Sequence, residues 1–491
     1  MRRERVWRRR MAGAAVAMAA LAAAPGAAAG PGQEAIVQDD HLLLRSGPQA
    51  RDRGLDEIAA LGATTIRVLV EWNAYAPAAS STVRPRFNAA DPRAYAPAFT
   101  ALDGLVAGAG ARRLNVMLVP TTPAPVWASR CGGLVRLRPA CDPSPAEFGR
   151  FVTALGRRYP RAVRRWGIMN EPNVDGRLAP QYIRAGRRWV PRSPALYRAL
   201  VRAATGALRA TGHGRDLVLL GETAPVSGLS SPAANRSMQT DLFLRTLLCV
   251  GGGARLPSAI ATSSLGCRPF ARLAVTGFAH HPYQTRGGAS PVRPPRDGGF
   301  SLGNLGPLYG LLTRGVQRGR IPAGLPMHLT EYGFQTSPPD ALLGIPLAIQ
   351  ARHLDASAYV AYRDRRVASL AQYLLFDDDA PAGFQSGLRF RDGRPKPALD
   401  AFRLPIWVEP RGSDVEVFGQ VRPARELPDL VEIQRRQRAG APWETVRFVT
   451  VTGRRALFLA RVARRGGEWR LRWTPPRSTT PFFSRTAGER R

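Results

Sequence analysis

The strongest constraint on this chain is an alternation of short β-like runs with longer amphipathic stretches between about residues 34 and 405. The runs predicted as strands are Glu34–Gln38, Thr64–Val70, Leu114–Val119, Arg164–Met169, Leu217–Leu220, Leu273–Ala279, Met327–Thr330 and Ala368–Phe376. The stretches between them with an apolar stripe at helical spacing include Pro92–Arg112, Pro145–Tyr159, Ala195–Ala210, Asp241–Val250 and Ala348–Tyr362. Repeats of this kind predict an α/β fold, a (β/α)₈ TIM barrel with enlarged loops. A doubly wound open sheet is the alternative, but no glycine-rich nucleotide turn follows the first strand.

The pattern changes after the segment Lys396–Arg403. The runs that follow are short and alternating, with turn residues between them: Val415–Phe418, Val431–Gln434, Thr445–Val451, Ala456–Ala460 and Trp469–Trp473. They predict a small all-β sandwich. We therefore divide the chain into residues 1–29, a barrel at 30–405 and an accessory, noncatalytic module at 406–491. Because the linker is so short, we expect this module to pack against the barrel rather than to bind polysaccharide.

Residues 1–29 have the features of a signal peptide. Six arginines and Glu4 lie in the first ten residues, an uncharged apolar run follows, and Ala27–Ala29 supplies a small-residue cleavage pattern before Gly30. An uncleaved N-terminal anchor is the alternative. The signal predicts a secreted or cell-surface protein, and no later stretch is long and apolar enough to span a membrane in the mature chain.

The formal net charge is +35, and the only lysine is Lys396. The arginines are scattered, and no basic run is interleaved with aromatic residues that could stack on bases. We therefore expect no nucleic-acid partner, although an anionic cell-wall polymer stays open as a partner. The chain is expected to be a monomer.

Four cysteines in an exported chain indicate disulfides. Short loop closure favours pairing Cys131 with Cys141 and Cys249 with Cys267 among the possible connectivities. Their spacing does not resemble a zinc site, so we assign them a structural role.

Two segments place a glutamate directly after a predicted strand. They are Trp166-Gly-Ile-Met-Asn-Glu-Pro-Asn173, after the fourth strand, and His328-Leu-Thr-Glu-Tyr-Gly-Phe334, after the seventh. In a parallel barrel, such residues face the cleft at the carboxyl ends of the strands. Two carboxyls delivered in this way can cleave a glycosidic bond, one holding a proton and the other attacking the sugar or activating water.

With Asn170-Glu171-Pro172 and Glu331, the chain resembles glycoside hydrolase clan A, a superfamily of retaining glycosidases. The cellulase-like family 5 or a related family such as family 39 is the nearest pattern. The resemblance implies that Glu171 is the general acid/base and Glu331 the nucleophile. We expect the pKa of Glu171 to be raised by burial and by the nearby carboxylate. We expect the two carboxyls to lie ~5–5.5 Å apart, the spacing for retention of configuration.

Other strand ends fit the same resemblance. Arg67 matches the second-strand arginine beside the nucleophile, and Asn170 is placed to bind the sugar 2-hydroxyl. His281 and Tyr283 match a His-x-Tyr motif, in which the tyrosine bonds the nucleophile and the histidine contacts sugar or Glu171. Candidate platforms for sugar rings are Trp72, Trp127 and Phe376. The chain departs from many cellulase-like members in lacking a histidine after the third strand and in having Phe376 where a tryptophan is common.

The sequence predicts no metal and no cofactor. Adjacent residues on one strand point opposite ways, so His280 and His281 are not expected to share a metal. Asp377–Asp379 lacks the ligand spacing of a calcium loop. Glu71 and Glu222 also stand at strand ends and are assigned supporting or structural roles.

These observations predict a secreted retaining hydrolase of β-linked oligo- or polysaccharides. The alternatives are a transglycosylase with the same covalent intermediate and a noncatalytic carbohydrate-binding surface protein.

Overall fold

The computed structural model describes residues 32–133, 140–228, 231–251, 265–284, 288–294, 299–380, 383–424 and 427–489. The predicted signal peptide, residues 1–29, and its cleavage point before Gly30 lie outside the described residues. Within the ranges above, no helix is long and apolar enough to cross a bilayer.

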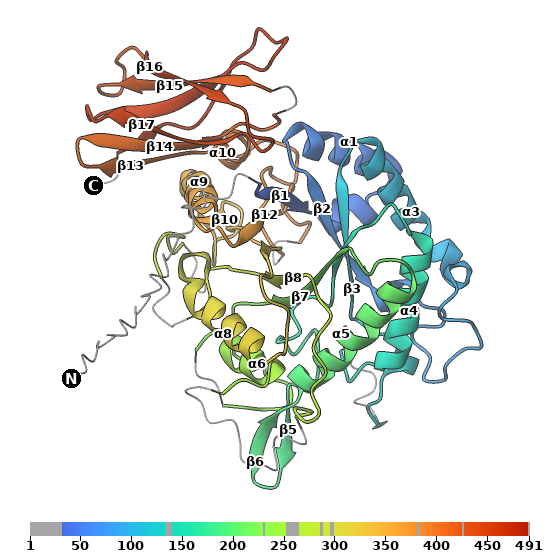
Figure 1. The fold of residues 1–491 in the computed structure, drawn as a ribbon. Helices are drawn as coiled ribbons and strands as arrows, with labels where there is room; N and C mark the ends of the chain where they lie inside the picture. Colours follow the sequence, from blue (N-terminus) through green and yellow to red (C-terminus); the bar gives the residue numbers. More distant parts are fainter. Residues whose placement is uncertain are drawn as a thin grey trace, which may run out of the picture.

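Parallel strands form a closed barrel at the centre of the molecule (Figure 1). In chain order the barrel strands are β1 Glu34–Gln38, β2 Thr65–Glu71, β3 Asn115–Thr121, β4 Arg165–Gly167, β7 Leu217–Thr223, β8 Gly277–His280, β9 Met327–Leu329 and β12 Val367–Tyr373. Each pairs with its neighbours in parallel, and β1 closes the ring by pairing with both β2 and β12. The predicted TIM barrel is therefore confirmed.

Helices follow the barrel strands and pack around the ring. The longer ones are α1 Gly47–Ala60, α3 Ala96–Ala111, α4 Pro145–Arg158, α5 Ser193–Ala210, α6 Thr240–Leu247, α8 Gly306–Gln317, α9 Leu347–Arg363 and α10 Pro397–Arg403. Short turns η1 His41–Arg45, α2 Trp72–Tyr75, η2 Pro92–Tyr95, η3 Val126–Ala128 and η5 Leu302–Asn304 lie in the loops. Small two-stranded sheets complete the loops, β5 Tyr182–Ala185 with β6 Arg188–Pro191, and β10 Thr336–Ser337 with β11 Ile345–Pro346.

The predicted sixth strand begins four residues before β8 does. The fourth, seventh and eighth predicted strands run past the carboxyl ends of the strands that form, the fourth and the eighth by the most. The fourth stops at Gly167 because Met169 takes a left-handed backbone conformation, φ 61°, that cannot continue a strand. The eighth ends at Tyr373, three residues before the predicted end at Phe376. Both differences lie at the carboxyl end of the barrel, where the chain turns away from the sheet to build the cleft.

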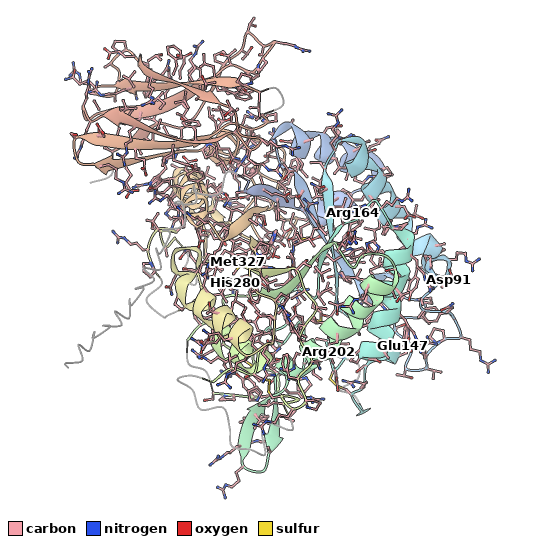
Figure 2. The ribbon with its side chains drawn as sticks, in the orientation of Figure 1. Asp91, Glu147, Arg164, Arg202, His280 and Met327 are labelled. Atoms are coloured by element: carbon pink, nitrogen blue, oxygen red, sulfur yellow. A yellow bond between two sulfur atoms is a disulfide. The ribbon has the colours of Figure 1, made fainter. Side chains whose placement is uncertain are left out.

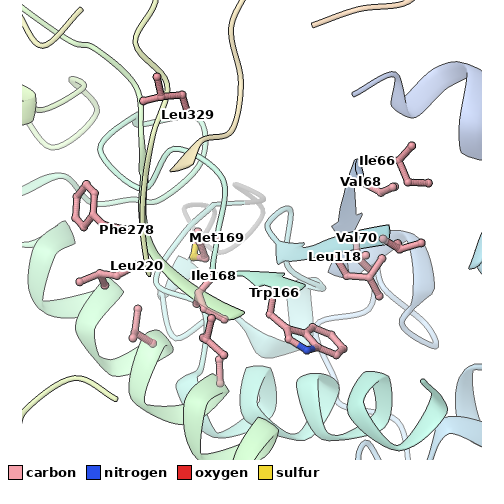
Figure 3. Close-up of a cluster of buried hydrophobic side chains, with 14 of the residues drawn as sticks. Ile66, Val68, Val70, Leu118, Trp166, Ile168, Met169, Leu220, Phe278 and Leu329 are labelled. Atoms are coloured by element: carbon pink, nitrogen blue, oxygen red, sulfur yellow. The ribbon is translucent and has the colours of Figure 1, made fainter. Parts of the chain in front are cut away.

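The barrel has apolar packing on both faces of its strands. Side chains between strands and helices form the larger cluster, part of which includes Trp166, Ile168 and Phe278 (Figure 3). A smaller cluster of alternating residues fills the barrel interior: Ile36, Met117, Val119, Leu219, Ala279 and Ala371. The polar residues at the carboxyl ends of the strands therefore lie on a closely packed apolar layer inside the barrel.

Two antiparallel sheets follow the barrel, as predicted. Their strands are β13 Ile406–Arg411, β14 Asp414–Gln420, β15 Asp429–Arg436, β16 Glu444–Val451, β17 Leu457–Ala463, β18 Glu468–Trp473, β19 Phe482–Phe483 and β20 Ala487–Gly488. One sheet has the order β13-β14-β17 and the other β16-β15-β18-β19, with β20 paired to β18. Their inward side chains, Trp469 and Trp473 among them, share one core. The alternating pattern predicts core positions for Trp443, Trp469 and Trp473; the last two are buried in the core, whereas Trp443 is half-buried and lies against the guanidinium groups of Arg436 and Arg470.

The sheets contact the barrel at the end where its strands begin (Figure 1). Arg455 pairs with Glu34, the first residue of β1, at 3.1 Å. On α9, the buried Asp355 pairs with Arg485, and the Tyr359 ring stacks on Trp407 at 6.0 Å between centroids. The β module therefore lies at the face opposite the carboxyl ends of the strands.

Both predicted disulfides form, Cys131–Cys141 and Cys249–Cys267. Each closes a loop outside the barrel strands. Among the described residues, no free cysteine is present.

Candidate active site

Two strand ends turn sharply to present carboxylates. Glu171 and Glu222 both have φ 48°, in the left-handed region that non-glycine residues seldom adopt. The backbone N–H of Glu171 donates to the carbonyl of Glu222 at 2.9 Å, which joins the two turns. Backbone strain of this kind persists when the surrounding structure holds it, and it gathers at functional sites.

The predicted catalytic pair meets above the barrel. One carboxylate oxygen of Glu171, one of Glu331 and one ring nitrogen of His281 all lie within 4.8 Å of one another. Glu331 is 7% exposed and Glu171 is half-buried, so both reach the cleft while most of each side chain is held by protein. Residues 160 positions apart in the sequence thus face the same point.

Arg67 joins the pair from below. Its guanidinium is fully buried and contacts Glu331 at 3.1 Å, Glu222 at 2.5 Å and the Oδ1 of Asn170 at 2.7 Å. It also donates to Gln38 on β1. A planar guanidinium can hold several oxygens in fixed positions, so Arg67 orients Glu331 as the sequence predicted.

Tyr283 and Asn170 also lie where the sequence placed them. The Tyr283 hydroxyl donates to Glu331 Oε1 at 3.1 Å. The backbone N–H of Asn170 donates to Thr121 Oγ1 at 3.0 Å, so the β3 and β4 ends hold each other. Glu331 therefore accepts from Tyr283 through one oxygen and from Arg67 through the other.

His281 lies between two carboxylates. Its Nδ1 is 3.0 Å from Glu171 Oε1, and its Nε2 is 3.3 Å from Glu222 Oε2. Burial lowers the pKa of His281, but Glu331, Glu171 and Glu222 outweigh that effect and raise it to about 9. The imidazole is therefore cationic at neutral pH.

The pKa of Glu171 is shifted in the opposite direction from the sequence prediction. Burial raises the pKa of Glu171, but the hydrogen bond and charge of His281 outweigh burial, so the net shift is downward. The predicted rise in the pKa of Glu171 is wrong for the unliganded site. The physical reason is the adjacent His281, whose cationic form stabilises the ionised carboxylate.

A metal does not suit this cluster. Glu171, His281 and Glu331 have the composition of a metal site. However, the cationic His281 carries hydrogens on both ring nitrogens and has no lone pair for a metal. Arg67 also lies against Glu331, and its charge repels a cation.

Trp72 and Trp127 are corrected from platforms to core residues. They are 1% and 7% exposed and pack edge to face at 5.9 Å, and Trp72 stacks on Phe151 at 5.9 Å. The Trp127 indole donates to the Pro77 carbonyl at 3.0 Å. Their faces are covered because the loops after β2 and β3 fold over them, which no single segment of sequence reveals.

Phe376 is partly buried and packs against the barrel core, and its backbone N–H donates to Asp39 at 3.1 Å. Because β12 ends earlier than predicted, Tyr373 occupies the strand end. Its pKa is raised by burial first and then by the charges of Glu331 and Asp40. Tyr373 at the end of β12 and Phe384 in the loop that follows have ring centroids 5.3 Å apart. We call these two aromatic residues the rim of the cleft, and the sequence did not identify either of them.

The remaining strand-end residues separate into two groups. The ring nitrogens of His280 lie 2.9 Å from Thr223 Oγ1 and 2.5 Å from the Phe300 carbonyl rather than on the cluster carboxylates. Figure 2 labels His280, at the end of β8, near Met327 of β9. Burial lowers the pKa of His280 to about 4, so it is neutral. Glu71 pairs with Arg45 at 3.1 Å, a supporting contact as expected.

Glu222, which the sequence assigned a supporting or structural role, lies within the cluster, whereas the sequence did not identify Asp40. Glu222 is buried and contacts Arg67 and His281 directly. Asp40, after β1, accepts from Gln38 Nε2 and the Leu69 N–H, both at 2.7 Å. Burial raises its pKa to about 6. The sequence feature that could have identified Asp40 is its position as an acidic residue two places after a predicted strand.

A cavity of about 250 Å³ opens beside Tyr283. Aromatic and aliphatic side chains form much of its wall, including Phe334, Ile345 and Phe384, and Gln284 and Gln335 contribute amides. Such a mixed wall suits a ligand with apolar faces and hydroxyl edges.

No protein-family description and no curated protein matches the sequence. Among solved structures the chain is similar to Bacteroides uniformis beta-glucuronidase 2 (10% identity, TM-score 0.42, 94% of this chain and 47% of that one). It is also similar to GH5_18 from Streptomyces cattleya (16%, TM-score 0.49, 76% and 79%). A third is a glucosidase from Croceicoccus marinus (13%, TM-score 0.49, 87% and 82%). The chain thus spans about half the length of the beta-glucuronidase. The barrel assignment rests on the strand pairing of this chain itself.

Proposed function

We propose that this chain is a retaining O-glycoside hydrolase of the clan A type that cleaves β-linked oligo- or polysaccharides by double displacement. The observation that carries the proposal is the pairing of Glu171 and Glu331 across the cleft, with carboxylate oxygens within 4.8 Å. Carboxyl groups this close leave no room for a water between them, which is the arrangement for retention rather than inversion.

Glu331 is the nucleophile in this proposal. Arg67 and Tyr283 each occupy one of its oxygens in the resting site, at 3.1 Å in both cases. They keep the carboxylate ionised and oriented toward the sugar. When Glu331 attacks the anomeric carbon, the bond to the leaving oxygen breaks and a glycosyl ester forms on Glu331.

Glu171 is the acid and then the base. The cluster of Glu171 and His281 holds one proton across a 3.0 Å contact, either on the carboxyl or on the imidazole. Transfer from His281 to Glu171 makes the carboxyl an acid that protonates the leaving oxygen. Glu171 then takes a proton from water as that water attacks the ester, so the cluster regains its starting state.

Asn170 supports the transition state. Its Oδ1 accepts from Arg67 at 2.7 Å, which leaves the amide N–H₂ to donate to the sugar 2-hydroxyl. That contact strengthens as positive charge develops on the ring.

We further propose that the protein is secreted or held at the cell surface and acts as a monomer without a metal or cofactor. The signal-like residues 1–29 motivate the location. A transglycosylase, in which a sugar replaces water as acceptor, is the second candidate because its first step uses the same carboxyl pair. A noncatalytic carbohydrate-binding protein is the rival of a different class.

The test begins with a screen of nitrophenyl glycosides and of plant and microbial polysaccharides. With an active substrate, proton NMR in the first minutes should show a product with the starting anomeric configuration. A 2-deoxy-2-fluoro glycoside should leave a covalent sugar on the peptide containing Glu331. An inverted first product contradicts the mechanism. Sugar binding with neither turnover nor a covalent sugar identifies the noncatalytic rival, and disaccharide formation identifies the transglycosylase.

A further inference from the structure

Glu222 is the most enclosed carboxylate of the site. Its side chain is 0% exposed, at the end of β7 and beneath the catalytic pair. Oε2 accepts from Arg67 at 2.5 Å, from Thr330 Oγ1 at 3.2 Å and from His281 Nε2 at 3.3 Å. A buried charge is costly unless it is paired, and here both cations of the cluster are its partners.

The missing side chain at Gly167 leaves room for the Glu222 carboxylate inside the barrel. Gly167 on β4 lies beside it, and a Cβ at that position would be 2.4 Å from Glu222 Oε1 and 2.9 Å from Val119. Oε1 itself has no hydrogen-bond partner among the described residues. All contacts of the carboxylate are therefore made through one oxygen and directed at Arg67, His281 and Thr330.

Three carboxylates, Glu171, Glu222 and Glu331, share two cations, Arg67 and His281, in this cluster. The charged and titratable groups that interact with Glu222, His281 or their direct partners are Asp40, Arg67, Glu171, Arg177, Tyr197, His280, Tyr283, His328, Glu331 and Tyr373. Arg67 balances one carboxylate of the catalytic pair. His281 contacts the other, Glu171, and lies 3.9 Å from Glu331, and a third carboxylate at its far nitrogen adds to the charges that keep it cationic while buried. Glu222 is at that nitrogen.

We propose that Glu222 is a positioning residue of the reaction, the fixed counter-charge that holds Arg67 against Glu331 and keeps a proton on the His281–Glu171 pair. This inference rests on the proposed function. The site then works as a relay: Glu222 stays ionised, His281 passes its Nδ1 proton to Glu171, and Glu171 passes it to the leaving oxygen. When Glu171 takes a proton from water, His281 takes it back, and no proton is gained or lost over a cycle.

Replacement of Glu222 by glutamine tests the negative charge of this residue separately from its hydrogen bonds. A glutamine oxygen can occupy the Oε2 position and accept the same three hydrogen bonds, while its N–H₂ occupies the place of the unpartnered Oε1. In Glu222→Gln, the pair should lose its proton more easily, because the negative charge that stabilised it is gone. The alkaline limb of kcat/KM should therefore move to lower pH by roughly one to two units.

The matched control is Glu71→Gln. Glu71 is also a glutamate at a strand end, on β2, but its partners are Arg45 at 3.1 Å and Arg177 at 3.9 Å, and among the described residues it has no hydrogen bond to Arg67, His281 or the glutamates of the cluster. Its pH profile should equal that of the wild type. The charge-preserving Glu222→Asp should lose rate but keep the alkaline limb of the wild type. An unshifted alkaline limb in Glu222→Gln overturns the inference.

A measurement on the wild type covers the case in which Glu222→Gln does not fold. Nitrogen-15 spectra of histidine-labelled protein, with His281 assigned by its loss in His281→Gln, should show both ring nitrogens protonated at pH 7. A neutral His281 at pH 7 overturns the inference. This readout is independent of turnover. A chain with no glycosidase activity, but with a cationic His281 whose titration moves to lower pH in Glu222→Gln, contradicts the proposed function and supports the role of Glu222 in holding the proton.

Discussion

At the scale of single residues, neighbours decide what each carboxyl of this cleft does. Glu222 is ringed by two cations, and although burial raises its pKa, Arg67 and His281 lower it to about 2. Asp40 lacks a direct cation, and burial raises its pKa to about 6. The same functional group is therefore a permanent anion at Glu222 and a titrating group at Asp40.

The catalytic pair gives the first prediction. Glu331→Gln should abolish turnover, because no other group can form the ester. Glu171→Gln should slow the hydrolysis of substrates whose leaving group needs a proton by roughly 10²–10⁴-fold, the usual contribution of general acid–base catalysis. Dinitrophenyl glycosides should be affected less, since their leaving group departs unprotonated, and azide should partly rescue Glu171→Ala. Steady-state kinetics check all three variants, and full activity in Glu331→Gln contradicts the assignment.

The buried histidine gives a second prediction, on stability. The pKa of His281 is about 9 in the folded protein and 6.5 without the fold. A raised folded pKa adds stability that is complete below about pH 6.5 and lost as the pH rises through about 9. The difference in melting temperature between the wild type and His281→Gln should therefore shrink from pH 6 to pH 9.5. A difference that does not change with pH refutes this linkage.

At the scale of elements, short strands and covered loops build the site. β4 has three residues, and the chain beyond it turns so that Asn170 and Glu171 face the cleft. The loops after β2 and β3 are locked by an aromatic cluster in which Trp72 contacts Trp127, Phe148 and Phe151. Rigid supports of this kind are what hold catalytic groups at fixed distances.

The aromatic cluster gives a third prediction. Trp72→Ala should destabilise the protein by about 3–5 kcal/mol, because it opens a cavity in a packed core. Phe384→Ala is the matched control, since Phe384 is 44% exposed at the rim and should change stability by less than about 0.5 kcal/mol. Urea unfolding measures both. A stable Trp72→Ala with a raised KM would restore the sugar-platform role.

The disulfides give a fourth prediction. They close loops of 10 and 18 residues, and each should contribute ~2–3 kcal/mol by restricting the unfolded chain. The pair Cys249→Ser and Cys267→Ser should lower the melting temperature while leaving kcat/KM nearly unchanged, because neither bridge touches the cluster. Non-reducing peptide mapping of the wild type supplies the control, and crossed pairing there would contradict the assignment.

At the scale of the whole molecule, the proposed catalytic groups and the β module lie at opposite ends of the barrel. The proposed catalytic groups lie at the carboxyl ends of the strands, and the β module covers the other end and the side formed by α9. Asp355 shows how close this junction is, because its buried carboxylate depends on Arg485 of the module. We therefore propose that residues 406–491 have a packing role rather than a catalytic one.

Removal of the module gives the fifth prediction. A chain ending at Arg403 should be less soluble or should melt at a lower temperature, since Tyr359 and Asp355 lose the partners that cover them. Thermal denaturation and residual activity on a small glycoside measure the effect. A soluble barrel with normal melting and turnover, but with lost polymer binding, would instead assign the module a binding role.

The sequence by itself determined the features that depend on local pattern. Strand and helix periods predicted the barrel, short loops predicted the cysteine pairs, and Arg67, Asn170, Glu171, Tyr283 and Glu331 were found because parallel strands bring their carboxyl ends together. Only the tertiary structure decided burial and charge. It covered the two tryptophans, ended β12 at Tyr373 and placed a cationic His281 against Glu171, which reversed the expected pKa shift of Glu171. The physical reason is that exposure and electrostatics are sums over neighbours from distant parts of the chain, and local periodicity carries no record of them.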